Sequence, residues 1–280
     1  MILVKGAGEL ASGIAWRLVM CGFPVVMTEV AQPLAVRRLV SFCSAVYHGS
    51  WTVEGVTAQL VSSAEEAVSL LGRTRPASPA PPATPFPRPI PLFVDPTASC
   101  IATLHPAAVV DAIMAKRNLG TTLGDAPVVI GVGPGFTAGT DCHAVVETQR
   151  GHWLGRVYYA GAAIADTGEP AERGGHSQGR IVRAPAPGPF AGAVAIGTRV
   201  GPGDALGHVG TVPVYAAIGG ILRGLVFDGT PVTPGLKIGD IDPVCEPERC
   251  HTISDKALAV AGGVLEALLH LGAKGGTKGG

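Results

Sequence analysis

The chain has 280 residues and a mass of 28.3 kDa, which is long for one compact domain and short for three. Hydrophobic residues make up 47% and charged residues 15%, so disorder caused by excess charge is excluded. The 21 basic and 21 acidic side chains cancel, which disfavours nucleic-acid binding because no overall positive field attracts phosphate backbones.

No membrane span and no signal peptide are expected. The first charged residue, Lys5, follows an apolar start, which is the reverse of a signal peptide. The longest uncharged stretch, Ala205–Leu222, is interrupted by glycines and a proline. The cysteines form no CxxC pair. We therefore expect a cytoplasmic protein with mostly reduced thiols.

The first thirty residues predict a βαβ unit. A buried strand at Ile2–Lys5 leads through a glycine turn into a helix over about 10–20 and a second strand at Pro24–Thr28. The turn has the spacing GxGxx(G/A) of a dinucleotide-binding loop, whose candidate binding residues here are Gly6, Gly8, Glu9 and Ala11.

Glu29 ends the second strand, where such units carry a ribose-binding carboxylate. Glu9 suits the helix dipole but would repel a bare pyrophosphate. A Rossmann-like fold with an empty or altered ligand site is therefore the alternative interpretation.

Alternating elements continue along the chain and predict a mainly parallel α/β sheet. The predicted strands are Ala45–His48, Val53–Leu60, Ile90–Val94, Ala107–Asp111 and Val128–Val132, with helices at Ala64–Leu71 and Ala98–Leu104. The proline-rich segment Gly72–Pro91 predicts an exposed, extended excursion. It is either a plain linker or a ligand for an aromatic groove.

A glycine-rich loop follows the strand at Val128–Val132 and is the leading candidate for binding an anion. Its candidate residues are Gly133, Gly135, Thr137 and Thr140. Lys116, after the preceding strand, either adds a cationic phosphate contact or lies in a solvated loop.

The residues after this loop contain a candidate catalytic row. If residues 141–149 form a strand, alternation places Asp141, His143 and Glu147 on one face. Such a row could bind a divalent metal or relay a proton. A structural pairing of His143 with one of the carboxylates explains the pattern equally well.

Residues 182–209 repeat at 214–241, shifted by 32 positions, and predict two intertwined β-halves. The pattern resembles the barrel-sandwich hybrid of biotinyl and lipoyl domains. In those domains a lysine in the joining hairpin carries the cofactor. The joining segment Gly210–Pro213 has no lysine, so we expect neither biotin nor lipoate.

A helix follows Ser254, its predicted N-cap, and runs to about Leu271. Its Gly262-Gly263 pair predicts close packing or a bound ligand. We expect a Rossmann-like α/β domain over 1–160, the barrel-sandwich domain over 178–244, this helix (245–271) packed on the first domain, and a disordered tail over 272–280.

Several strings together resemble the YqeB family: GAGELASGIAWRL, TEVAQPLAVRR, VVDAIMAKRNLGTT, VIGVGPGFTAGTDCHAVVETQRGHWLGRVYY and ISDKALAVAGGVLEALL. That family is associated with the selenium-dependent molybdenum hydroxylase system and with maturation of the molybdenum cofactor. The resemblance implies an accessory protein whose client is a molybdenum hydroxylase of the xanthine dehydrogenase type. Its expected ligand is a nucleotide or the pterin-based molybdenum cofactor. An NAD-dependent oxidoreductase and a non-catalytic scaffold that binds client proteins are the alternatives.

Overall fold

The computed structural model of the chain describes residues 1–72, 88–168, 175, 178–244 and 246–272. They form two compact units. The first comprises Met1–Ala31, Phe42–Asp166 and Ser254–Gly280, and the second comprises Gln32–Ser41 and Thr167–Ile253. The short segment Gln32–Ser41, which precedes most of the α/β elements in sequence, thus belongs to the β-rich unit.

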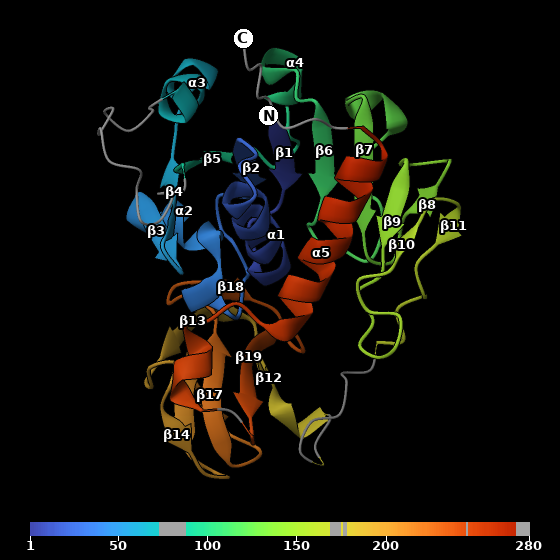
Figure 1. Cartoon of the computed structure of the whole chain (residues 1–280). Helices are drawn as coiled ribbons and strands as arrows, with labels where there is room; N and C mark the ends of the chain where they lie inside the picture. The colour runs from blue at the N-terminus through green and yellow to red at the C-terminus, as the bar shows by residue number, and fades with distance from the viewer. Residues whose placement is uncertain (73–87, 169–174, 176–177, 245, 273–280) are drawn as a thin grey trace, which may run out of the picture. The chain divides into compact units, whose positions relative to one another are not determined.

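The first unit is built on a nine-stranded sheet with the order β10-β9-β7-β6-β1-β2-β5-β4-β3. Its strands are β1 (Ile2–Lys5), β2 (Val25–Glu29), β3 (Ser50–Val53), β4 (Val56–Leu60), β5 (Ile90–Val94), β6 (Ala108–Asp111), β7 (Val128–Val132), β9 (Ala144–Val146) and β10 (Val157–Tyr158). All neighbours pair in parallel except at the two edges, where β3 and β10 are antiparallel. The predicted mainly parallel sheet is confirmed (Figure 1).

The helices of this unit are α1 (Glu9–Met20), α2 (Ala45–His48), α3 (Ala64–Gly72), α4 (Ile101–Leu104) and α5 (Asp255–His270). A small two-stranded sheet pairs β8 (Thr137–Ala138) with β11 (Gly161–Ala162). Every residue of β1 and β7 is buried, because central parallel strands are covered on both faces.

The direction of winding changes at β1. From β1 the chain passes through α1 to β2 on one side, whereas β6 lies on the other side of β1 and leads on to β7. The switch point therefore lies between the carboxyl ends of β1 and β6, where Lys5 and Asp111 are aligned in register. In open α/β sheets, ligands bind outside the carboxyl ends of the strands at such a point.

Two of the predicted strands are wrong in detail. Ala45–His48 is the short helix α2, because four apolar residues carry too little periodicity to separate helix from strand. The predicted strand Val53–Leu60 is instead part of a hairpin of β3 and β4. Its two turn residues, Glu54 and Gly55, have φ of 41° and 80°, which a tight hairpin turn requires.

Helix α5 lies beside α1, with α1 against β1 and β2 and α5 against β7, β9 and β10 (Figure 1). The predicted cap is confirmed, since Ser254 Oγ accepts a hydrogen bond from the Ala257 amide at 3.2 Å. A Cβ on Gly263 would lie 2.3 Å from the carbonyl oxygen of Gly155, whereas one on Gly262 would meet no atom within 4 Å. Only Gly263 is therefore required for close packing.

The second unit contains two four-stranded antiparallel sheets, with orders β12-β19-β17-β14 and β16-β15-β13-β18. Their strands are β12 (Ile181–Arg183), β13 (Gly188–Gly192), β14 (Arg199–Val200), β15 (Ala205–Val209), β16 (Val212–Tyr215), β17 (Gly220–Leu225), β18 (Pro231–Val232) and β19 (Lys237–Asp242). A shift of 32 residues takes each of the first four strands onto one of the last four. Each sheet takes strands from both repeats, so the halves are intertwined as predicted.

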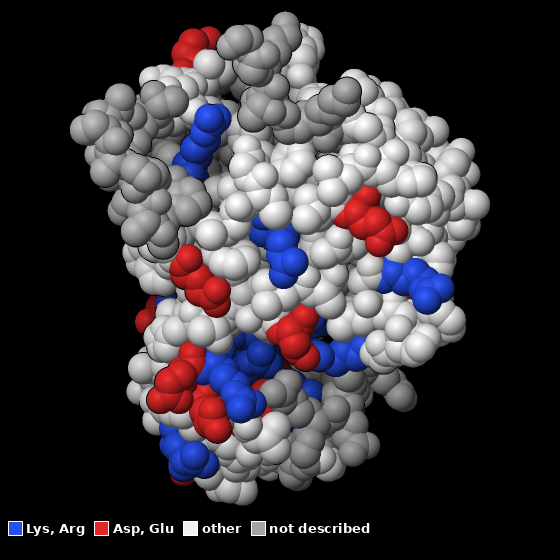
Figure 2. Space-filling model, viewed as in Figure 1, with Lys and Arg blue, Asp and Glu red and all other residues white. Residues whose placement is uncertain are grey.

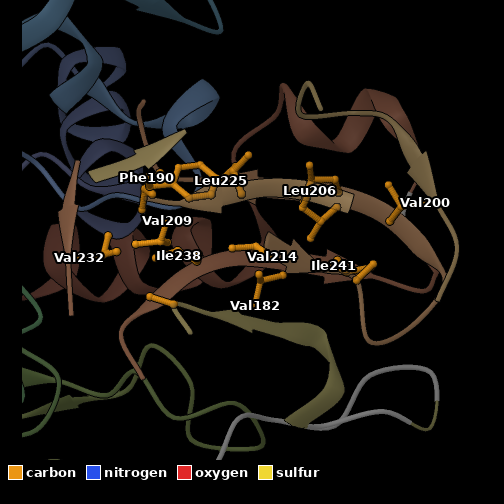
Figure 3. Packing of buried hydrophobic residues seen from close by; sticks show 14 of the residues in the cluster. Val182, Phe190, Val200, Leu206, Val209, Val214, Leu225, Val232, Ile238 and Ile241 are labelled. Atoms are coloured by element: carbon orange, nitrogen blue, oxygen red, sulfur yellow. The ribbon is translucent and has the colours of Figure 1, made fainter. Parts of the chain in front are cut away.

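Equivalent positions of the two repeats fill one core. The buried pairs are Val182 and Val214, Phe190 and Leu222, Val200 and Val232, Leu206 and Ile238, and Val209 and Ile241. Figure 3 shows side chains from both sheets meeting in this core. The segment Gln32–Ser41 joins it through Val36, whose carbonyl accepts the Leu225 amide at 2.8 Å.

Two predictions fall largely outside the described residues. They are the extended proline-rich excursion, most of which lies in 73–87, and the tail, most of which lies in 273–280. In the part of the chain that the structure describes, no helix is both long and apolar enough to cross a lipid bilayer.

The two adjacent glycines of α5 give a matched pair of variants. Gly263→Ala is expected to lower the free energy of unfolding by about 1–3 kcal/mol, because the new methyl group overlaps the Gly155 carbonyl. Gly262→Ala is expected to raise it by up to about 1 kcal/mol through helix propensity. Urea unfolding measures both, and equal effects of the two substitutions would contradict this packing.

Candidate ligand-binding site

The glycine turn after β1 lies close to the carboxyl ends of both neighbouring strands, β2 and β6. Gly6 has a φ of 88°, its amide donates to Thr28 O at 2.9 Å, and a Cβ there would lie 3.0 Å from Ile113 Cα. Ala11 is fully buried, as its place in the fingerprint requires. Gly8 is the N-cap of α1 and provides no side-chain cap, and nothing lies within 4 Å of its Cβ position.

Glu29 fixes this turn from the end of β2. Its Oε2 accepts the Ala7 amide at 2.9 Å and its Oε1 accepts the Val30 amide at 2.8 Å. Burial raises the pKa of Glu29, and these two backbone hydrogen bonds oppose the rise. The carboxylate predicted to bind a ribose therefore already holds the backbone of the loop.

A buried polar network lies at the switch point itself. The exposed fractions of Lys5, Asp111 and Thr121 are 5%, 2% and 1%. Lys5 Nζ donates to Thr121 Oγ1 at 2.5 Å and lies 3.6 Å from Asp111 Oδ2, while Thr121 Oγ1 donates to Asp111 Oδ2 at 2.6 Å. The side chain of Asn118 holds Thr121 in place by accepting its amide at 2.8 Å. The network ties β1 to β6 and orders the loop after β6.

The loops after β6 and β7 pack against each other at the same edge of the sheet. A Cβ on Gly135, whose φ is 104°, would lie 2.5 Å from Arg117 Cα. A Cβ on Gly133 would lie 2.9 Å from Thr148 Oγ1 and 3.2 Å from Met114 Cε. The two glycines are therefore needed for the close approach of three loops.

Thr137 and Thr140 do not lie with these glycines at the carboxyl edge of the sheet. They belong to a turn in which Asp141 Oδ2 accepts the Thr137 amide at 2.8 Å and the Thr140 amide donates to Thr137 O at 3.1 Å. The chain folds back along β7, since the amide of His143 donates to Val129 O at 2.8 Å near the start of that strand. The predicted binding loop is thus divided, and only Gly133 and Gly135 lie at the carboxyl edge.

The predicted row of Asp141, His143 and Glu147 depends on a strand that is shorter than expected, because β9 spans only Ala144–Val146. His143 Nδ1 accepts the Val129 amide at 3.0 Å, before β9 begins. Glu147 follows β9 and is fully buried; its carboxylate accepts the amides of Thr148, Gln149 and Ile164 at 2.7, 2.7 and 2.8 Å. Each of the three side chains therefore bonds to a different part of the backbone.

No group of three or more His, Cys, Asp or Glu side chains that could hold a metal ion occurs among the described residues. The metal-binding form of the predicted row has no support from the geometry. Its role in a proton relay stays a prediction.

Cations gather at the carboxyl edge around Glu147. Lys116 Nζ binds Asp166 Oδ2 at 2.8 Å, and Arg150 binds both oxygens of Asp255 at 2.9 and 3.1 Å. Burial lowers the pKa of Lys256, in the first turn of α5; Arg150 and Lys116 lower it further, and Glu9 and Glu147 oppose the change. On the face seen in Figure 2, some basic side chains stand singly and others form a small group bordered by acidic ones.

Sequence reasoning missed Lys5, Thr121, Arg150 and Lys256. Lys5 and Asp111 lie far apart in sequence and meet only through the parallel register of β1 and β6. Arg150 meets Asp255, the residue before Lys256, because α5 returns to the first unit. The only local signal was the position of Lys5, a charged residue at the end of a buried strand and directly before the glycine turn.

A separate hollow of about 590 Å³ opens at the opposite edge of the sheet. It is lined by the residues that precede β1, β6 and β7, among them Met1, Ala107 and Pro127, with His105 and Asp125 as its titratable side chains. Parallel sheets bind ligands at the carboxyl edge, where the glycine turn and the buried network lie. We therefore place the candidate site there and not in this hollow.

The protein YqeB of Escherichia coli strain K12 is 47% identical over 271 residues, which are 97% of this chain and 48% of YqeB. The chain thus spans about half the length of this relative. No family model matches the chain.

Two solved structures show only local likeness. An aspartoacylase family protein of Mesorhizobium loti is 16% identical over 24% of each chain, with a TM-score of 0.22. A succinylglutamate desuccinylase/aspartoacylase of Rhodobacter sphaeroides is 23% identical over 24% of this chain and 22% of that one, with a TM-score of 0.21. No conclusion about fold or activity rests on them.

The buried network predicts a large difference between two lysine variants. Lys5→Met leaves Asp111 buried without its cation and is expected to lower the free energy of unfolding by about 3–5 kcal/mol. Adding Asp111→Asn to that variant should recover more than half of the loss. Lys116→Met breaks an ion pair whose side chains are 55% and 38% exposed and should cost less than about 1 kcal/mol.

Chemical unfolding of the four proteins measures these differences. If Lys5→Met and Lys116→Met lower the free energy of unfolding by similar amounts, the network at the switch point does not have the proposed stabilising role.

Proposed function

Because the chain belongs to the YqeB family, across the half of YqeB that it spans, we propose that it is an accessory protein for a molybdenum hydroxylase of the xanthine dehydrogenase type. We further propose that it binds a phosphate-bearing ligand at the carboxyl edge of its sheet. The family resemblance supports the client, and the geometry of the first unit supports the ligand.

The observation that carries the ligand part is the start of α1. The amides of the first turn of a helix have no partner within the helix, and the helix dipole makes this end positive. Here the N-cap is Gly8, which provides no side-chain oxygen, and the space around its Cβ position is open. An anion at this point would satisfy those amides and would lie beside the switch point.

The ligand class follows from the groups around that helix start. Gly6, Gly133 and Gly135 let three loops approach closely, which suits a phosphate bound by main-chain amides. A nucleotide and the pterin-based molybdenum cofactor both carry such a phosphate, and the cofactor would be cargo for the client enzyme. Glu29 uses both carboxylate oxygens on the amides of Ala7 and Val30, which weakens the case for a ribose contact.

The same contacts favour this proposal over an NAD-dependent oxidoreductase. His143, the predicted proton relay, bonds through Nδ1 to the start of β7 and not at the edge where the glycine turn lies. The proposed chemistry is therefore binding and transfer of a ligand, with no residue assigned to a redox step.

For the β-rich unit we propose a role separate from ligand binding. We infer that it is a barrel-sandwich hybrid, since its two sheets exchange strands between repeats. The segment Gly210–Pro213, which joins the repeats, contains no lysine for biotin or lipoate. We assign this unit to docking of the client hydroxylase.

Substitutions at Gly8 separate helix capping from ligand binding. Gly8→Asp and Gly8→Ser should each cap α1 and raise the stability of the unliganded protein by a few tenths of a kcal/mol. Only Gly8→Asp should abolish the thermal shift produced by a phosphate-bearing ligand, because its charge repels the phosphate. The ligands to compare are NAD, NADP, CTP and isolated molybdenum cofactor.

A wild-type protein that shows no thermal shift with any of these ligands would refute the ligand part of the proposal. A shift that persists in Gly8→Asp would place the ligand elsewhere on the molecule.

The client part is tested on protein purified from its own host. Native mass spectrometry with elemental analysis should find a co-purifying molybdenum hydroxylase, or molybdenum bound to the chain itself. Capture of the hydroxylase that Gly8→Asp leaves unchanged, with no ligand bound, would support a client-binding scaffold instead.

A further inference from the structure

The segment Gln32–Ser41 belongs to the β-rich unit, whereas the residues on either side of it belong to the first unit. Those flanking residues hold one residue of the glycine turn. Glu29, before the segment, accepts the Ala7 amide through Oε2 at 2.9 Å. Cys43, after the segment, donates its amide to Ala7 O at 2.9 Å. The backbone of Ala7 is therefore held from both ends of the segment.

A second contact fixes the end at which the chain returns to the first unit. Ser12 Oγ accepts the Phe42 amide at 2.7 Å and donates to Ala7 O at 3.1 Å. Ser12, Phe42 and Ala7 are all fully buried, so water does not compete for these hydrogen bonds. The residue that follows the segment is thus fixed to both the glycine turn and the first turn of α1.

The middle of the segment is seated on β17 of the β-rich unit. Val36 O accepts the Leu225 amide at 2.8 Å. A Cβ on Gly224 would lie 2.7 Å from the same oxygen, so this approach requires a glycine in the strand. Leu39 packs against Ile221 on the same strand. The seat is therefore specific in both backbone and side-chain contacts.

Arg37 adds a buried cation to this seat, with an exposed fraction of 6%. Its Nη2 donates to Arg249 O at 3.0 Å and to Thr252 O at 3.3 Å. Ser41 Oγ donates to the Arg37 carbonyl at 2.8 Å. Thr252 stands just before Ser254, where the chain enters the first unit again as α5. One arginine thus ties the segment to a second crossing of the chain between the units.

We propose that Gln32–Ser41 is a strap that couples the glycine turn to the β-rich unit, with Arg37 as its positioning residue. Because the flanks of the strap hold both backbone groups of Ala7, releasing the strap from β17 loosens the turn. Such coupling is reciprocal, so loosening the turn also releases the strap. A further part rests on the proposed function: docking of the client on the β-rich unit then regulates the turn that holds the ligand.

Hydrogen–deuterium exchange of the full chain, followed by NMR without any ligand, measures the coupling. Arg37→Met should speed exchange of the Ala7 and Cys43 amides at least about tenfold, because the strap then opens more often. Arg37→Lys keeps a charged donor for the same carbonyls and should retain most of the protection. Arg183→Met removes another arginine of the β-rich unit, one that donates to Gly235 O at 2.9 Å, and should leave the turn unchanged.

Ser12→Ala tests the opposite direction. It removes the acceptor of the Phe42 amide in the first unit, and it should speed exchange at Leu225, whose acceptor is Val36 O in the β-rich unit. A role of Ser12 confined to α1 would leave Leu225 unchanged. Gly224→Ala displaces Val36 without altering Arg37, and it replaces Arg37→Met if that variant does not fold. Ser12→Ala decides if neither of them folds.

The outcomes separate this inference from the proposed function. Unchanged exchange at Ala7 in folded Arg37→Met or Gly224→Ala, or at Leu225 in Ser12→Ala, would overturn the strap. Coupling in the ligand-free chain, with no thermal shift from NAD, NADP, CTP or isolated molybdenum cofactor, would support the strap and refute the ligand part of the proposed function. If the wild type binds CTP, Arg37→Met should weaken that binding several-fold, and equal affinity would overturn the regulatory part.

Discussion

The buried pair of Lys5 and Asp111 joins the two strands between which the sheet reverses its winding. Both side chains are almost fully buried, and Thr121 bridges them. A charge in this position must be paired, so the register of β1 against β6 is restricted. The glycine turn after β1 and the loop after β6 begin at this pair, and their relative position follows from it.

Close approach of the backbone builds the remainder of the carboxyl edge. A Cβ at Gly6, Gly133 or Gly135 would lie 3.0, 2.9 or 2.5 Å from the nearest atom of a neighbouring loop, and all three residues have positive φ. The edge is therefore rich in main-chain groups and poor in free side chains, which suits recognition of a phosphate more than acid–base chemistry.

Sequence patterns correctly predicted the features that depend on residues close together in the chain. These are β1, α1, β2, the cap at Ser254 and the repeat of 32 residues. They failed where the partner was distant or the element short. Four apolar residues at Ala45–His48 could not be told from a strand, and alternation from Asp141 assumed a longer β9. Lys5 and Lys256 gave no local spacing to read, because the sheet register and the return of α5 give them their surroundings.

Hydrogen–deuterium exchange with CTP and with isolated molybdenum cofactor tests the central claim most directly. Binding at the carboxyl edge predicts slower exchange at 6–11 and 133–135, where the amides at the start of α1 and the packed glycine loops would contact the ligand. Protection confined to 101–107 and 124–127, which line the hollow at the opposite edge, would contradict it.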